Sequence, residues 1–444
     1  MTEQNQTLSQ KKILLFWLPL AATWIMMSTE GNFLAAIIAR LAEPKYNLAA
    51  YGVAFSFALI IEAPIIMIMS ASTALVRDKQ SFLKLRNFTY FLNACLTGII
   101  LIVIFPSLFY FLTITLIGLP ENIARLTHHA MILLIPWPAA IGYRRFFHGI
   151  LIRNNLTRRV AYSTTIRMLT MATTALILFS FFELDGALVG AAALSAGVCI
   201  EALASRFMVR QLVKRLLSGE ELEESGKGPL TYRSITSFYY PLALTSMIAL
   251  GAHPIITFFL GQSRMAIDSL AVWPVIVSLS FILISLGLST QEVIIALIGD
   301  KFENYKPLKK FSLALTFIVF LIMTFFVYTP VSALWLRTVS GLTIELSEFA
   351  LKPLAYYIFI PAASVWLCFQ RSILVAARRT GLVTVASGIE IVFIVSVLFI
   401  TVQYLDFVGV IAAVTAFNVA RVFSVSYLFF ACRKVLRPGR LGAS

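Results

Sequence analysis

Long apolar runs follow one another along almost the whole chain, separated by short polar segments. A helix that crosses the hydrocarbon core of a bilayer needs about 20 mostly apolar residues. Of the 444 residues, 59% are hydrophobic and 13% are charged, whereas about a quarter of the residues in soluble proteins are charged. The sequence therefore predicts an all-α integral membrane protein.

The apolar runs account for about twelve membrane-spanning helices. We place them at residues 13–38, 48–75, 88–117, 127–152, 161–182, 186–212, 234–260, 267–298, 309–336, 346–375, 382–404 and 406–432. The connecting segments are too short for a nucleotide-binding or catalytic domain, which needs at least about 50 residues. An ATP-hydrolysing pump is therefore disfavoured.

The basic residues lie mostly on one side of the predicted membrane. The net charge of +15 would suggest a nucleic-acid partner in a soluble protein. Here, alternate loops assigned to one side collect 24 of the 36 Lys and Arg residues, and the loops of the other side have six. Basic loops favour the cytoplasm, so we expect both termini there and no nucleic-acid partner.

Short segments recur at half the length of the chain. Phe16–Ala21 returns as Phe238–Ala243 with an offset of 222 residues, and Pro138–Ala140 returns as Pro361–Ala363 with an offset of 223. Because each half has six predicted helices, the repeats are parallel. We expect a six-helix lobe at 1–216, a cytoplasmic linker at 217–233, a second six-helix lobe at 234–432 and a cytoplasmic tail at 433–444.

Prolines inside several predicted spans should kink or break the helices there, because proline removes a backbone hydrogen bond. They are Pro64, Pro106, Pro136, Pro138, Pro254, Pro274 and Pro361.

Basic side chains gather near one end of the fourth and fifth predicted helices. Arg144, Arg145 and His148 share a helix face, and Arg167 lies at comparable depth on the next helix. Together they predict a positive vestibule suited to a carboxylate or phosphate. Two other interpretations stay open: the side chains reach the membrane interface as anchors, or they pair inside the protein with Glu62 or Glu201.

The second half has ionisable residues at positions equivalent to those of the first half, but with different charges. In the 223-residue register, His148 corresponds to Arg371 and Arg167 to Glu390. Arg421 lies near the middle of the twelfth predicted helix, and Glu390 is its most plausible partner. The predicted substrate-binding residues are Arg144, Arg145, His148, Arg167, Arg371, Asn418 and Arg421.

Acidic residues and one histidine inside the spans are candidates for ion coupling or for structural pairing, because a buried carboxylate can change its charge during transport. The candidates are Glu30, Glu62, Glu201, His253 and Glu390. The coupling ion would be a proton or sodium.

No catalytic signature occurs in the sequence: it has no GxxxxGK[ST] loop, no HExxH and no Gly-x-Ser-x-Gly elbow. The four cysteines are widely spaced, which predicts neither a disulfide framework nor a metal site. We therefore expect no enzyme, no metal and no cofactor.

Five segments carry a resemblance to a known family: the two Phe–Ala elements above, Leu48–Ser56, Gly149–Arg153 and His253–Ile256. They resemble the progressive ankylosis protein family, within the multidrug/oligosaccharidyl-lipid/polysaccharide exporter superfamily. The resemblance implies two six-helix lobes, alternating access and export of small polyanions such as pyrophosphate, ATP or citrate. The long C-terminal tail of animal members is missing, so the chain resembles a compact bacterial relative in the inner membrane.

The first hypothesis is thus a monomeric secondary transporter that exports a small polyanion by alternating access. The alternative is a proton- or sodium-coupled multidrug exporter, or a lipid-linked sugar flippase, of the same fold. In that alternative, Glu30, Glu62 and Glu390 bind the cation or proton, and the arginines only anchor the helices.

Overall fold

The computed structural model describes residues 8–38, 40–116, 119–218 and 230–436, which are almost entirely helical. Their contacts divide into an N-terminal unit, Thr29–Met247, and a C-terminal unit, Met1–Ser28 with Ile248–Ser444. Both divisions fall inside a helix, namely α1 (Gln10–Ile38) and α11 (Tyr232–Gly261). Most of the predicted linker, residues 219–229, lies outside the described residues, so the predicted lobe boundaries stay a prediction.

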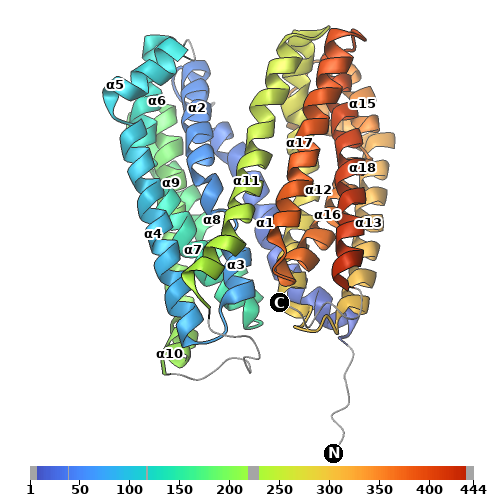
Figure 1. The fold of residues 1–444 in the computed structure, drawn as a ribbon. Helices are drawn as coiled ribbons and strands as arrows, with labels where there is room; N and C mark the ends of the chain where they lie inside the picture. Colours follow the sequence, from blue (N-terminus) through green and yellow to red (C-terminus); the bar gives the residue numbers. More distant parts are fainter. Residues whose placement is uncertain (1–7, 39, 117–118, 219–229, 437–444) are drawn as a thin grey trace, which may run out of the picture. The chain divides into compact units, whose positions relative to one another are not determined.

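The N-terminal unit is a bundle whose long helices run alongside one another (Figure 1). Besides its parts of α1 and α11, its elements are α2 (Pro44–Glu62), the 3-10 helix η1 (Ala63–Ile65), α3 (Ile68–Leu75), α4 (Lys79–Val103), α5 (Pro106–Tyr110), the π-helix η2 (Phe111–Leu116), α6 (Glu121–Leu133), α7 (Trp137–Arg153), α8 (Thr157–Phe181), α9 (Gly186–Met208) and α10 (Arg210–Ser218). Within it, α8 packs along α9, and α7 packs against α3, α4 and α9.

The C-terminal unit is a second bundle of the same kind (Figure 1). Its further elements are α12 (Ala266–Leu297), α13 (Tyr305–Tyr328), α14 (Val331–Leu334), the π-helix η3 (Trp335–Val339), α15 (Ile344–Tyr356), α16 (Phe359–Ala376), α17 (Thr380–Gln403) and α18 (Gly409–Leu436). Here α17 packs along α18, and α16 packs against α12, α13 and α18.

The order of elements repeats between the two units. α8 begins at Thr157 and α17 at Thr380, while α9 begins at Gly186 and α18 at Gly409, an offset of 223 residues in both cases (380 − 157 and 409 − 186). Each unit also has a short π-helix, η2 or η3, at the equivalent place. This agrees with the duplication predicted from the short recurring segments.

Proline divides several of the predicted spans. Pro64 lies in η1, Pro106 begins α5 and Pro136 precedes α7, where its fixed backbone angle and missing N–H are tolerated. Pro274, by contrast, lies inside the uninterrupted helix α12.

In the described part of the chain, 11 helices are long and apolar enough to cross a membrane. The fourth predicted span, 127–152, is not among them, because it is divided into α6 and α7, which have 13 and 17 residues.

Helices of both units present large apolar side chains on their outside. Phe91 is 70% exposed, Phe181 is 79% exposed and Phe325 is 65% exposed. Such surfaces are rare on soluble monomers and are expected where a helix faces lipid. The protein is accordingly a multi-pass membrane protein.

Candidate functional site

A network of buried charges lies in the core of the N-terminal unit, where Arg144 on α7 and Arg167 on α8 meet Glu201 on α9. Arg144 Nη1 lies 3.1 Å and Arg167 Nη1 lies 3.5 Å from Glu201 Oε2. Arg167 Nη2 also pairs with Glu30 Oε2 on α1. Four helices therefore place their ionised groups at one point of the core.

Uncharged side chains extend this network. The Trp137 indole N–H donates to Glu62 Oε2 at 2.5 Å, and the Arg167 guanidinium lies 5.7 Å from the centre of the Trp137 ring. The Thr164 hydroxyl donates to Glu201 Oε1 at 2.9 Å. Each contact satisfies a polar group that would otherwise be costly to bury.

His148 lies in the same core without an acidic partner among the contacts described. Its Nε2 lies 2.8 Å from Ser205 Oγ on α9 and 2.8 Å from Ser163 Oγ on α8. The imidazole thus ties α7 to both neighbouring helices. Arg145, next to Arg144 in sequence, is also buried.

These side chains do not form the predicted positive vestibule. Arg144 and Arg167 are each 2% exposed, Glu201 is 0% exposed, and the arginines are paired with acids. Of the three interpretations that the sequence left open, pairing describes the contact of Arg144 with Glu201. Glu62 instead accepts its hydrogen bond from Trp137. Substrate contact by these residues stays a prediction.

The side chains joined by these contacts include more carboxylates than guanidinium groups. The carboxylates are those of Glu30, Glu62 and Glu201, and the guanidinium groups are those of Arg144 and Arg167. Glu30 Oε1 is buried and accepts no hydrogen bond from the part of the chain that the structure describes. Arg144 Nη2 and Arg167 Nε are likewise buried and donate no hydrogen bond within the described residues. Because carboxylates outnumber guanidinium groups among the joined side chains, the Glu30 oxygen is the atom that suits a proton or a small cation.

A second charged group lies in the C-terminal unit, on the equivalent helices α16, α17 and α18. Arg421 Nη2 lies 3.0 Å from Glu390 Oε1, and Arg371 Nη2 lies 3.7 Å from Glu390 Oε2. Arg371 also donates to the Ser387 hydroxyl at 3.1 Å. The structure thus contains the Glu390–Arg421 pair that the sequence predicted. With two guanidinium groups around one carboxylate, the trio has a net charge of +1.

This trio differs from the N-terminal network in its accessibility. The side chains of Arg371, Glu390 and Arg421 are 18%, 14% and 12% exposed, and they line a cavity of about 180 Å³. Tyr357, Phe417 and Phe281 line the cavity as well, and most of its other walls are aliphatic. It therefore offers a charged group beside an apolar surface.

An aromatic cluster fixes one wall of this cavity. The ring centres of Trp273 and Phe417 are 5.6 Å apart, and the Tyr357 ring lies 6.1 Å from each of them. Offset and edge-on aromatic contacts of this kind hold each ring in place. The apolar wall is therefore built before any ligand arrives.

Asn418, another predicted substrate-binding residue, makes a structural contact in this unit. The Asn418 side-chain amide donates to the Tyr356 carbonyl at 2.8 Å and to the Val414 carbonyl at 3.1 Å, so it ties α18 to the end of α15. His253 lies in α11, and its side chain falls outside the described residues. No group of three or more His, Cys, Asp or Glu side chains within the described ranges is placed to hold a metal.

Several residues of both sites escaped the sequence analysis. Helical spacing could have found Ser387, three residues before Glu390, and Phe417, four residues before Arg421. The link between Glu62 and Trp137 joins residues 75 positions apart and has no signal in a single sequence.

No family model matches the sequence, and no curated protein matches it. Solved structures do match in fold. A MATE transporter in the bent conformation is 15% identical, with a TM-score of 0.75 over 96% of this chain and 95% of that one. A MOP superfamily transporter from Pyrococcus furiosus, described as having a binding pocket of reverse polarity that suggests a different function, is 16% identical, with a TM-score of 0.75 over 97% and 98%. The Vibrio cholerae MATE transporter VcmN in the bent form is 15% identical, with a TM-score of 0.68 over 97% and 98%.

These likenesses show a MATE-like transporter fold with two lobes, which is the fold that the sequence predicted. At such low identity they show the fold alone. The narrower resemblance to the progressive ankylosis protein family stays a prediction.

Proposed function

We propose that this protein is a secondary exporter that moves small amphiphilic organic molecules across a membrane by alternating access. The observation that carries the proposal is the match of nearly the whole chain to nearly the whole length of MATE transporters. The match leaves no described segment for a separate motor domain. In this proposal an ion gradient drives transport.

The buried network of the N-terminal unit supports the coupling step. It holds three carboxylates against two guanidinium groups, with an unmatched oxygen on Glu30. Binding of one proton or cation there would neutralise the excess charge. It would also change the strength of the Glu30–Arg167 pair, which connects α1 to α8, and so bias two arrangements of the bundle.

The cavity of the C-terminal unit supports a substrate with one negative charge and an apolar part. Its trio has a net charge of +1, and its other walls are aromatic and aliphatic. A volume of about 180 Å³ lies below the roughly 300–1,000 Å³ of sites for drug-sized ligands, so it suits one fragment of a molecule. This fits an amphiphilic monoanion.

The polyanion predicted first from the sequence is supported less well. Arg144 and Arg167 of the expected vestibule are paired with Glu201 and Glu30, and the accessible trio has only one unit of excess positive charge. A multiply charged anion with no apolar part would leave the aromatic wall unused.

A cationic drug is also disfavoured in this cavity, because both oxygens of Glu390 already face arginine. The P. furiosus neighbour, with its reverse-polarity pocket, is a precedent for changed pocket charge on this fold.

Efflux from proteoliposomes tests the proposal. Purified full-length protein is reconstituted into vesicles loaded with dansylglycine, ethidium or citrate, which represent an amphiphilic monoanion, an amphiphilic cation and a polyanion. We expect a pH or sodium gradient to drive saturable efflux of dansylglycine above that from protein-free vesicles. Gradient-driven release of citrate or ethidium in its place would overturn the substrate class, and no gradient-driven release of any probe would overturn the exporter.

A further inference from the structure

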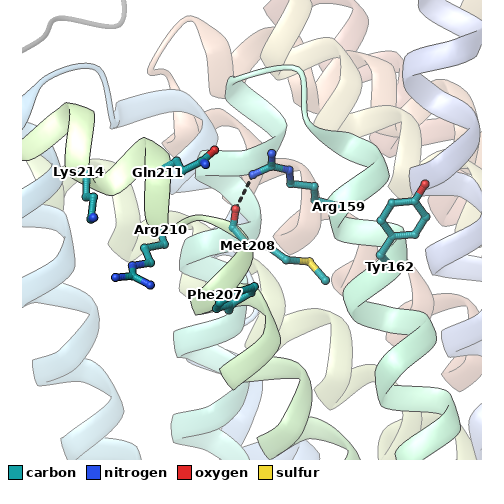
Figure 2. Close-up of a pocket in the computed structure, with 7 residues that line it drawn as sticks. All are labelled: Arg159, Tyr162, Phe207, Met208, Arg210, Gln211 and Lys214. Atoms are coloured by element: carbon teal, nitrogen blue, oxygen red, sulfur yellow. Dashed lines mark hydrogen bonds between the residues drawn. The ribbon is translucent and has the colours of Figure 1, made fainter.

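A second, larger pocket lies in the N-terminal unit, away from the buried charge network. Its volume is about 630 Å³, and it is open to the outside. Figure 2 shows the side chains that line it: they come from the start of α8, the end of α9 and the short helix α10. None of the transport chemistry above uses this pocket.

The lining residues carry three positive charges. Arg159, Arg210 and Lys214 contribute one each, and no acidic residue of the described chain is among those that line the pocket. Arg159 Nη1 donates to the Met208 carbonyl at the end of α9 at 2.6 Å, which holds its guanidinium at the pocket wall (Figure 2). Arg210 and Lys214 are exposed and follow one turn apart on α10.

The position of the pocket along the helices coincides with the edge of the apolar spans. The candidate span on α8 begins at Thr157, two residues before Arg159, and the span on α9 ends at Met208, two residues before Arg210. Lipid phosphates lie at this boundary between hydrocarbon and water. The distribution of Lys and Arg predicts that this side is cytoplasmic, where anionic lipids attract basic segments.

Apolar side chains continue from the pocket toward the hydrocarbon. Tyr162 is 60% exposed and Phe207 is 74% exposed, and both line the pocket. Leu203, one turn before Phe207 on α9, is 65% exposed. A molecule with a phosphate at the basic side chains can thus lay its acyl chains along an apolar surface that starts in the same pocket.

Helix α10 has the pattern of a segment that lies at the membrane surface. Its Leu212, Val213 and Leu216 are buried against the unit, whereas Arg210, Lys214 and Arg215 are exposed. Because the unit already covers its apolar face, α10 turns its basic face outward, beside the end of the α9 span at Met208. This orientation presents its positive side chains at the depth of the headgroups.

We propose that this pocket binds one anionic phospholipid, with its phosphate held by Arg159, Arg210 and Lys214 and its acyl chains along Tyr162 and Phe207. Bound in this way, the lipid bridges α8, α9 and α10. The inference does not depend on the proposed export function, because it concerns a different face of the unit.

Native mass spectrometry of the full-length protein tests it, with dioleoyl phosphatidylglycerol and dioleoyl phosphatidylcholine as probes. The test variant is R210Q with K214Q. The matched control is R158Q with R215Q. It also removes two exposed positive charges, one from α8 and one from α10, but neither side chain lines the pocket. We expect the wild type and the control to bind one phosphatidylglycerol more tightly than phosphatidylcholine. The test variant should bind it about 30-fold more weakly, from about 1 kcal/mol per basic side chain.

Each other outcome overturns the proposal. Equal affinity of the test variant and the wild type would exclude the pocket. Equal losses in the test variant and the control would indicate general surface charge. Equal binding of the two lipids would exclude recognition of the headgroup charge, and displacement of phosphatidylglycerol by an excess of inorganic phosphate would identify a site for a free anion.

Discussion

Arg144 Nη1 lies 3.1 Å from Glu201 Oε2, and the two side chains are 2% and 0% exposed. Removing one member of such a pair leaves an uncompensated charge in a low-dielectric core, whereas the intact pair contributes little net stability. Glu201 also serves Arg167 and Thr164, so three groups depend on it. Its loss would therefore leave two buried arginines without their shared carboxylate.

Replacing Glu201 by glutamine should lower the free energy of unfolding by about 3–5 kcal/mol, because both arginines would lose their shared carboxylate. A denaturant titration in detergent measures this. E183Q, at an exposed position, is the matched control and should change the free energy by less than about 0.5 kcal/mol. Equal stability of the two variants would show that Glu201 is not needed to compensate the buried charges of the two arginines.

Replacing Glu30 by glutamine should separate folding from transport. Glutamine keeps the size of the side chain and a hydrogen-bonding oxygen for Arg167, but it cannot take up or release a proton. We expect a folded protein whose gradient-driven efflux of dansylglycine falls at least tenfold, while exchange without a gradient is less affected. Efflux equal to that of the wild type would show that Glu30 takes no part in ion coupling.

Gly149 allows α7 to approach α3 closely. A Cβ at this position would lie 2.6 Å from the Met69 carbonyl oxygen, which is backbone and cannot rotate away. G149A should therefore be destabilised by about 1–3 kcal/mol, from overpacking. G98A is the control, since nothing lies within 4 Å of a Cβ there. A G149A variant as stable as G98A would contradict the close approach.

Asn418 should matter for stability and not for substrate affinity. Its amide holds α18 to the Tyr356 carbonyl, so N418A should cost about 1 kcal/mol of unfolding free energy. The dissociation constant of dansylglycine, from a fluorescence titration, should stay within about twofold of the wild-type value. A large rise of that constant without a loss of stability would restore the substrate role predicted from the sequence.

The sequence alone predicted the all-helical membrane fold and the two repeated halves, because apolar length and a constant offset of about 223 residues are local or periodic signals. It also predicted that Glu390 pairs with Arg421, from one acid and one arginine too deep to reach water. It left pairing of Glu30 and Glu201 with arginine open beside other interpretations and did not say which acid meets Arg144 and which meets Arg167, since that depends on how α1, α7, α8 and α9 rotate about their axes. Periodicity locates a helix but does not fix the direction of one arginine.

In the proposed function, the Arg371–Glu390–Arg421 trio binds an anionic group beside an apolar wall. Fluorescence titration of dansylglycine against the purified wild type, R421Q and E390Q tests this most directly, because the two substitutions shift the charge of the trio in opposite directions, from +1 to 0 and to +2. We expect R421Q to bind dansylglycine at least about tenfold more weakly than the wild type, and E390Q to bind it as tightly as the wild type or more tightly. Unchanged binding by R421Q, or weaker binding by E390Q than by R421Q, would contradict this role of the trio.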